Sequence, residues 1–188
     1  LIGACISVAM IFVAISGPGI SPFDPIRQNV YHRLTSPERS HLLGTDEYGR
    51  DVLSRIFTGT RISFFVSIIS IILGMVIGTG MGMLAGYAGG KVQTLLMRTL
   101  DIMMAFPDEV FGVMVMIVLG TGVENVIIAI PVLMIPRFAR MGHAPTLALK
   151  EQDYIAAAKS IGASDSRVII HHILPNIFGE ILVMSTLW

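Results

Sequence analysis

The chain of 188 residues is 53% hydrophobic and only 14% charged, whereas an average soluble domain is about 25% charged. This composition argues against a free soluble globule. Lys plus Arg and Asp plus Glu both total 13, so there is no basic excess to hold a polyphosphate, and nucleic acid is not an expected partner. The single cysteine, Cys5, excludes an internal disulfide and a cysteine-rich zinc site.

The first apolar run, residues 1–16, is too short to cross a bilayer, whose core of about 30 Å needs roughly 20 helical residues. No basic segment precedes it, as one would precede the core of a signal peptide. We therefore expect it to be the end of a first transmembrane span. Because the sequence opens on Leu1 and stops at Trp188 inside another apolar stretch, we expect a fragment of a longer protein.

A polar stretch, residues 17–61, comes next and is expected to emerge into water. Between Arg61 and Lys91 the sequence has no charged residue and no histidine, so residues 62–87 are predicted to form the second span. Within it, glycines recur every four residues and form one stripe along the helix, where another backbone can approach closely. They are Gly74, Gly78, Gly82 and Gly86. The stripe indicates helix packing alone or, in addition, a smooth face that slides during a conformational cycle.

The next two predicted spans are less regular. Residues 95–120 contain Pro107, Asp108 and Glu109 in the middle, and the part after Glu109 would reach only roughly 16 Å. The acidic pair is therefore expected at some depth in the membrane or at a kink. Residues 123–141 contain two prolines and are expected to form a short, bent span. Residues 62–143 are thus predicted to hold three spans.

A second polar stretch, residues 144–176, is followed by residues 177–188, the expected start of a fifth span. Alternating crossings put residues 17–61 on one side of the membrane and residues 86–91 and 144–176 on the other. Seven Lys and Arg residues fall on the second side against six on the first, which favours the second side as cytoplasmic. Residues 17–61 are then an extracytoplasmic loop.

Three candidate enzyme motifs are incomplete in this sequence. Gly90-Lys91 lacks both ends of the phosphate-loop pattern. The serines of the second span have no histidine beside them that could act as a general base. His171 and His172 are adjacent and lie on different faces of a helix, so they do not form a metal pair. We predict no catalytic residue, no metal site and no cofactor. An intramembrane hydrolase is the least favoured interpretation.

Residues 151–175 predict a helix, a turn and a second helix. Glu151 and Asp153 suit a helix N-terminus, three alanines follow, and Gly162 ends the first helix. Ser164 or Asp165 can cap the second helix, which is expected to continue until a proline leads into the next span. A short connector of small residues between two spans is suited to docking in a groove of a partner.

This stretch resembles the EAA loop of permease subunits in binding-protein-dependent ABC importers. That pattern reads Glu-Ala-Ala, three residues, Gly, nine residues, Ile, one residue, Leu-Pro. Two positions depart from it, because Ala156 replaces the glutamate and His172 replaces the isoleucine. The resemblance implies that the loop couples to an ATPase, and the implied coupling residues are Ala156, Ala157, Ala158, Gly162, Ala163, Ser164, Asp165, Leu174 and Pro175.

A second motif narrows the resemblance. Residues 41–55, with the segment 59–63, resemble the region before the second span in the C-type permeases of dipeptide, oligopeptide and nickel importers. The parts of the chain at 85–90 and 97–107 are similar to the same family. The motif residues are Gly44, Thr45, Asp46, Gly49, Arg50 and Asp51. Two interpretations stay open for them: a structural plug that orients the start of the second span, or a docking site for the substrate-binding protein.

The family resemblance implies an all-α, polytopic membrane protein with the type I ABC importer permease fold, of which this chain would be a fragment of a six-span subunit. It implies a bacterial or archaeal plasma (inner) membrane as the location. The implied partners are a second permease subunit forming a heterodimer, two cytoplasmic ATPase subunits, an extracytoplasmic substrate-binding protein and membrane lipid. The chain would be a transport subunit, and ATP hydrolysis would belong to the partners.

Acids inside a predicted span usually face the bundle interior or a water-filled cavity. Asp108 and Glu109 are therefore candidates for the translocation path, where they would attract a cationic group, or else are paired or hydrated near Pro107. An alternative function is a stand-alone channel or ion-coupled carrier, which would use Asp108, Glu109 or Glu124 as ion ligands and need no ATPase.

Overall fold

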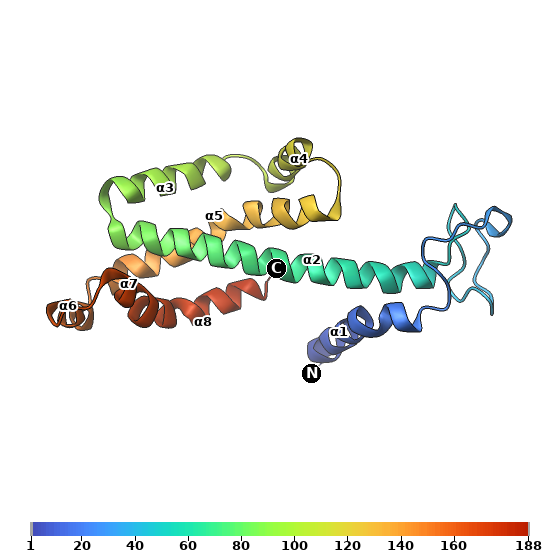
Figure 1. The fold of residues 1–188 in the computed structure, drawn as a ribbon, viewed down its shortest axis with the longest axis horizontal. Helices are drawn as coiled ribbons and strands as arrows, with labels where there is room; N and C mark the ends of the chain where they lie inside the picture. The colour runs from blue at the N-terminus through green and yellow to red at the C-terminus, as the bar shows by residue number, and fades with distance from the viewer. Residues whose placement is uncertain (1, 188) are drawn as a thin grey trace. The chain divides into compact units, whose positions relative to one another are not determined.

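The protein is described by a computed structural model that covers residues 2–187 (Figure 1). The prediction of an all-α protein is confirmed, since the described residues form no strand and contain one isolated bridge, Thr45 to Asp51. The helices are α1 (Ile2–Ile20), η1 (Val30–His32), α2 (Val52–Ala88), α3 (Gly90–Met103), α4 (Asp108–Leu119), α5 (Val123–Leu149), α6 (Asp153–Ser160), α7 (Asp165–Val168), η2 (Ile169–Ile173) and α8 (Leu174–Ser185).

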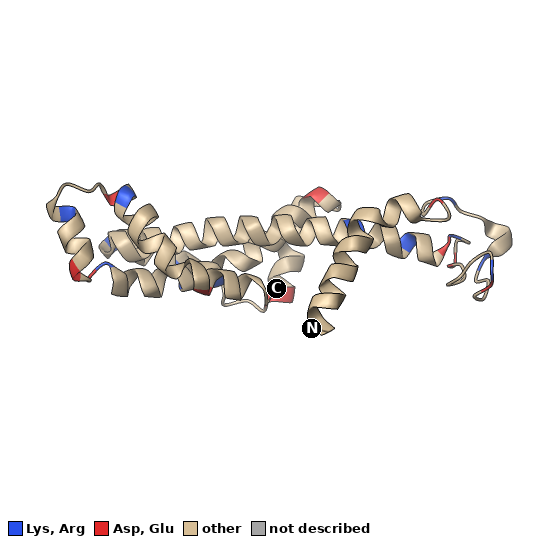
Figure 2. Cartoon of the chain, turned by 90° about the horizontal axis from the view of Figure 1, so that it is seen from below, with Lys and Arg blue, Asp and Glu red and all other residues tan. Residues whose placement is uncertain are grey.

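Four helical segments are long and apolar enough to cross a membrane, namely α1, α2, α5 and the stretch from α7 to α8. The helices α3 and α4 pass the same test only as a pair, and they are bent by 95° at the residues between them. With 37 residues, α2 spans roughly 55 Å and exceeds the bilayer core. Figure 2 shows its central part without a charged residue.

The chain divides into two compact units, with the boundary after Ser67 inside α2. In the first unit, α1 continues to Ile20, past the end at residue 16 that the sequence suggested, and Pro18 lies inside its last turn. A proline near the end of a helix removes only one backbone hydrogen bond. Close packing also holds this turn, because a Cβ built on Gly17 would lie 3.1 Å from the Cβ of Phe57 in α2.

In the second unit, the end of α2 lies against α5 along the glycine stripe. A Cβ built on Gly78 would lie 2.6 Å from the carbonyl oxygen of Ile135, and one on Gly86 would lie 2.8 Å from that of His143. Cβ atoms on Gly74 and Gly82 would likewise collide with α5. Only glycine allows the two backbones to approach this closely.

The hydrophobic core of the second unit joins the membrane helices to α6 and α7. It consists of buried side chains from α2, α5, α6, α7, η2 and α8, which are Met83, Met134, Phe138, Ile155, Val168, Ile173, Ile177 and Ile181. The buried side of the connector between α5 and α8 therefore belongs to the same hydrophobic core as the membrane helices. This shared core positions the connector relative to the membrane helices.

Two helix ends differ from those expected. The helix α5 runs to Leu149, beyond the boundary at residue 143, and contains three prolines. Pro175 does not interrupt the last helix, because residues Ile169–Ile173 form a π turn and Pro175 then falls in the first turn of α8. A proline in a first turn gives up a backbone N–H that has no helical partner there.

Candidate functional site

The connector between α5 and α8 is the first candidate site, and its central part, residues 153–168 (α6, a four-residue turn and α7), is called the elbow below. The N–H of Gly162 donates to the carbonyl of Lys159 over 2.9 Å, and the N–H of Ala163 donates to that of Ala158 over 3.0 Å. This pair of bonds is a Schellman motif, which ends α6 and turns the chain. Gly162 has the positive φ of 89° that the motif requires.

The second half of the elbow begins with a side-chain cap. The Ser164 hydroxyl accepts a hydrogen bond from the N–H of Arg167, and α7 starts at the next residue, Asp165. Ser164 rather than Asp165 is thus the cap, because its side-chain oxygen satisfies an N–H group that has no helical partner. The reversal of direction is fixed by backbone and cap contacts local to the elbow.

The two faces of the elbow differ in burial. Ile155 and Ala158 are 1% and 8% exposed and face the core. Ala156 and Ala157 are exposed, and the large apolar side chain of Ile161 is 88% exposed at the turn. The outer face of the elbow therefore carries small side chains and one large apolar side chain at the turn.

The remaining predicted coupling residues lie on either side of this face. Gly162, Ser164 and Asp165 are exposed at the turn, and Ala163 is half-buried against the core. Leu174 and Pro175 lie beyond the elbow at the start of α8, where Leu174 packs against the core and Pro175 is exposed. The predicted set therefore contains a surface part and a part that supports it.

A tyrosine of the segment 85–90, to which sequence reasoning assigned no role, contacts the elbow. Tyr87, the second-last residue of α2, donates a hydrogen bond from its hydroxyl to a carboxylate oxygen of Asp165 over 2.5 Å. The ammonium of Lys159 lies 4.8 Å from the centre of the Tyr87 ring. Contacts with Tyr87 and the nearby carboxylates of Asp165 and Glu151 raise the pKa of Lys159, so Lys159 is positively charged at neutral pH.

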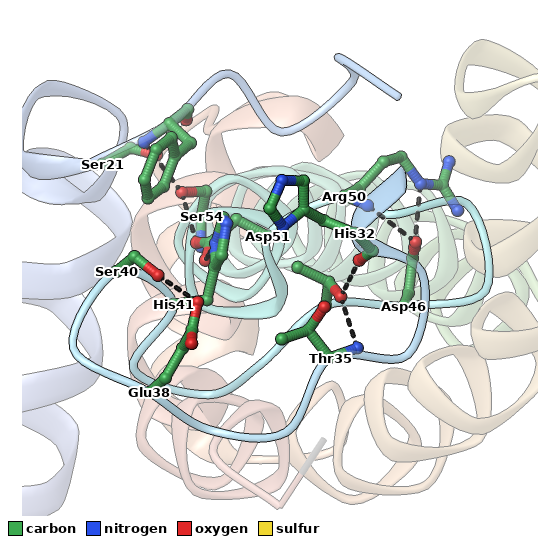
Figure 3. A network of polar contacts seen from close by, with 12 residues as sticks. Ser21, His32, Thr35, Glu38, Ser40, His41, Asp46, Arg50, Asp51 and Ser54 are labelled. Carbon is green, nitrogen blue, oxygen red and sulfur yellow. Dashed lines mark hydrogen bonds and ion pairs between the residues drawn. The ribbon is translucent and has the colours of Figure 1, made fainter. Parts of the chain in front are cut away.

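The second candidate site is the polar loop, residues 21–51, between α1 and α2 (Figure 3). At its end stands Asp51, whose side chain is only 1% exposed. Its carboxylate accepts from the backbone N–H of Ser54 over 2.8 Å and from the Ser54 hydroxyl over 2.7 Å, which caps α2. Its other oxygen lies 2.9 Å from Nδ1 of His41. Burial by itself raises the pKa of Asp51, but these hydrogen bonds from His41 and Ser54 outweigh it and lower the pKa.

Asp46 is the second carboxylate of the motif. It accepts hydrogen bonds from the backbone N–H groups of Tyr48 and Arg50, and it pairs with the guanidinium groups of Arg50, at 2.8 Å, and of Arg55. Desolvation opposes the charged form, but these donors outweigh it and lower the pKa of Asp46 to about 2. Asp46 is therefore ionised throughout the physiological pH range.

The other motif residues shape the turns around these carboxylates. Gly44 and Gly49 both have φ of 72°, and a Cβ on either would collide with loop backbone, at Thr35 or at Asn29. The buried Thr45 hydroxyl accepts from the N–H of Thr35 and donates to the carbonyl of His32. A pocket of about 570 Å³ lies beside this network and is lined partly by His41, Asp51 and Phe23.

The acids predicted for the translocation path follow the 95° bend. Asp108 and Glu109 form the first turn of α4, and the Asp108 carboxylate pairs with Arg137 of α5. A second ion pair, between Asp101 of α3 and Arg140 of α5 at 2.7 Å, holds the other side of the bend. Asp108 and Glu109 also line an open, largely apolar groove of about 680 Å³ between α4 and α5.

The three acids proposed as ion ligands of a carrier are not brought together as a cluster. Glu124 lies in the first turn of α5, and Asp108 is neutralised by an arginine. Within residues 2–187, no three side chains of the metal-binding types gather in one place.

Sequence reasoning thus found the carboxylates but, apart from Arg50 beside Asp46, not their partners. His41, Ser54, Arg137, Arg140 and Tyr87 stand 10 to 78 residues along the chain from the acids that they contact, apart from the short step between Asp51 and Ser54. The sequence did contain a signal for two of these partners, Arg137 and Arg140. Charged groups inside a membrane protein are usually paired, so the arginines of α5 were natural candidates for the acids near Pro107.

Comparison with known proteins gives a consistent result. Residues 74–187 match the family described as "Binding-protein-dependent transport system inner membrane component". The chain is 35% identical over 187 residues, all of its length, to a dipeptide transport system permease protein of Alkalihalophilus pseudofirmus, covering 62% of that protein. It is 39% identical over 179 residues, 95% of its length, to a glutathione transport system permease protein of Pectobacterium atrosepticum, covering 60% of it.

A dipeptide transport system permease protein of Haemophilus influenzae is 37% identical over 193 residues, and the chain covers 65% of it. The chain thus spans less than two thirds of the length of these relatives. The match includes both the polar loop and the elbow, since it extends over nearly the whole chain.

Proposed function

We propose that this protein forms part of the permease of an ATP-driven importer. The chain belongs to the family of binding-protein-dependent transport system inner membrane components and is a multi-pass inner-membrane protein. The proposed cargo is a short peptide. Two kinds of relatives carry names of peptide cargo, dipeptides and glutathione. A nickel importer is the alternative within the same resemblance.

The observation that supports this proposal is the difference between the two faces of the elbow. Its underside belongs to the core of the membrane helices, while its outer face presents alanines and an apolar isoleucine to water. A short connector of small residues between two membrane helices is suited to docking in a groove of a partner. A rigid connector with a smooth outer face fits the groove of an ATPase subunit, whose opening and closing it would pass to the spans.

The partners follow from this role. We assign two cytoplasmic ATPase subunits to the side of the elbow, a second permease subunit to the membrane, and an extracytoplasmic substrate-binding protein to the side of the polar loop. ATP hydrolysis belongs to the ATPases, and this chain contributes the path and its gating. Differential contacts of the elbow with the open and closed ATPase states would shift the equilibrium between inward and outward openings.

The proposed path residue is Glu109. Asp108 is paired with Arg137, so its charge is balanced, whereas Glu109 stands at the same groove and adds a net negative charge. A cationic group of the cargo, such as the amine of a peptide, would be attracted there. Glu109→Gln should lower uptake of a cationic peptide relative to a neutral one. Equal uptake of both peptides by the variant, at the unmodified level, would contradict this role.

Site-specific cross-linking in the full-length protein tests the importer assignment. A photoreactive residue at Ser164, in native membranes, should capture a protein that mass spectrometry identifies as an ATPase. The same residue placed at Tyr31, which is 94% exposed in the polar loop, serves as the matched control and should not capture it. The assignment fails if Ser164 captures no ATPase although the protein is present at its usual level.

A further inference from the structure

Tyr87 lies where three helices of the second unit meet. It is at the C-terminal end of α2, its hydroxyl donates to Asp165 at the start of α7 over 2.5 Å, and its ring faces the ammonium of Lys159 near the end of α6. The ring also packs against the hydrophobic core. Both halves of the elbow are therefore attached to the same side chain of α2.

Both contacts bring a charged group to the Tyr87 phenol. A neutral hydroxyl donating to a carboxylate makes a charge-assisted hydrogen bond, which is roughly twice as strong as a bond between neutral groups. A cation over an aromatic ring adds a further attraction. The three groups also support one another, because the Lys159 ammonium offsets the charge that Asp165 brings to the phenol.

The chain itself connects the elbow to only two membrane helices. Residues 150–152 join it to α5, and η2 joins it to α8. The helix α2 is far away along the sequence, since the two partners of the hydrogen bond are 78 positions apart. Its link to the elbow depends on packing and on the contacts of Tyr87.

Movement of the elbow would also have to be transmitted to α2. The last four turns of α2 lie against α5 through Gly74, Gly78, Gly82 and Gly86. Side chains of α5, those of Met134, Phe138 and Thr146, lie against three of these glycines, so packing joins α2 to α5. The polar contacts of Tyr87, by contrast, join α2 directly to both halves of the elbow.

We propose that Tyr87 is a positioning residue that fastens the elbow to α2, so that movement of the elbow by the ATPase is passed directly to this helix through Asp165 and Lys159. The inference rests on the proposed function, because it assumes that an ATPase moves the elbow. It adds a named point of transmission that lies outside the docking face.

The test uses the full-length protein in the complex that co-purifies with it, reconstituted in lipid vesicles. Tyr87→Phe keeps the ring but removes the hydroxyl. We expect the peptide imported per ATP hydrolysed to fall about tenfold, within the usual range of couplings between sites. The yield of the complex and the cross-link from Ser164 to the ATPase should stay unchanged. Tyr31→Phe removes a hydroxyl from an exposed tyrosine of the polar loop and should leave the ratio as it is.

A double-mutant cycle separates this role from a structural one. Asp165→Asn keeps an oxygen that can accept the Tyr87 hydrogen bond and should retain much of the coupling, whereas Asp165→Ala should resemble Tyr87→Phe. In the Tyr87→Phe background, Asp165→Ala should add little, since the bond is already lost. Independent, multiplying effects of the two changes would overturn the proposal.

The outcomes also distinguish the two proposals. If no ATPase co-purifies with the unmodified protein, the proposed function itself fails. If the complex forms and the transport ratio of Tyr87→Phe equals that of the unmodified complex, only the role of Tyr87 fails. A loss of the complex in Tyr87→Phe would also overturn it, because the residue would then be needed for assembly rather than for transmission.

Discussion

The polar loop and the elbow are both polar stretches between membrane helices, yet they use their polar groups in opposite ways. In the loop, Asp46 and Asp51 each accept several hydrogen bonds from within the loop and the first turn of α2. In the elbow, local bonds fix only the turn, and the outer face with Ala156, Ala157 and Ile161 remains uncovered. The first region holds its own shape through internal contacts, whereas for the second we propose that the uncovered face meets a partner.

This difference favours the structural interpretation of the loop motif. The carboxylates of the motif are engaged by His41, Ser54 and two arginines, so few of their acceptor sites are left for a binding protein. Docking of that partner remains a hypothesis for the exposed parts of the loop and for the pocket lined by Phe23 and His41. For the elbow, the reverse holds, because its exposed face has no internal role.

The largest effect is expected from Asp51→Ala in the polar loop. The change removes the cap of α2 and leaves Ser54 and His41 without their acceptor. Losing a buried, hydrogen-bonded carboxylate of this kind destabilises a protein by about 3 kcal/mol. Thermal unfolding of the full-length protein, and the rate at which protease cuts the loop, would measure it.

Glu47→Ala is the matched control for that change, since Glu47 is an exposed acid of the same loop. It should alter neither stability nor cleavage. If Asp51→Ala were as stable as Glu47→Ala, the loop would not depend on its internal network, and its contrast with the elbow would disappear.

A smaller effect, on function only, is expected from Ala157→Trp in the elbow. The side chain is exposed, so a bulky replacement meets no neighbour in this chain and should leave the unfolding temperature unchanged. It would hold an ATPase away from the surface, and we expect peptide uptake in membrane vesicles to fall about tenfold, equivalent to about 1.4 kcal/mol of docking energy. Normal uptake by a stably expressed variant would show that the exposed face has no partner.

The smallest effect is expected when the polar loop is brought to a pH below 4. The pKa of Asp46 is about 2 in the folded protein, below its ordinary value of 3.8. Its charge therefore stabilises the loop above pH 4, and this stabilisation is lost as the pH falls toward 2. We expect protease resistance of the loop to be constant from pH 7 to pH 4 and to decline below it. With Asp46→Asn, the decline between pH 4 and pH 2 should become smaller. An unchanged decline in that variant would assign it to other acids.

The sequence by itself determined the features that depend on neighbouring residues. The uncharged run of residues 62–87, the turn at Gly162 and a cap at Ser164 or Asp165 are local, because hydrophobicity, a positive φ and a side-chain cap act within a few residues. The structure decided the cap in favour of Ser164. The glycine stripe was visible for the same reason, as a period along one helix. The π turn at Ile169–Ile173, which comes just before Pro175, was not predicted from the proline.

Only the tertiary structure decided which distant groups meet. The pairs of Asp108 with Arg137, of Asp101 with Arg140 and of Tyr87 with Asp165 join residues 29, 39 and 78 positions apart. A charged or hydroxyl side chain indicates that a partner is needed, but several candidates satisfy that need equally well. The choice among them depends on which helices pack together, and the bend between α3 and α4 and the close contact of α2 with α5 set that arrangement.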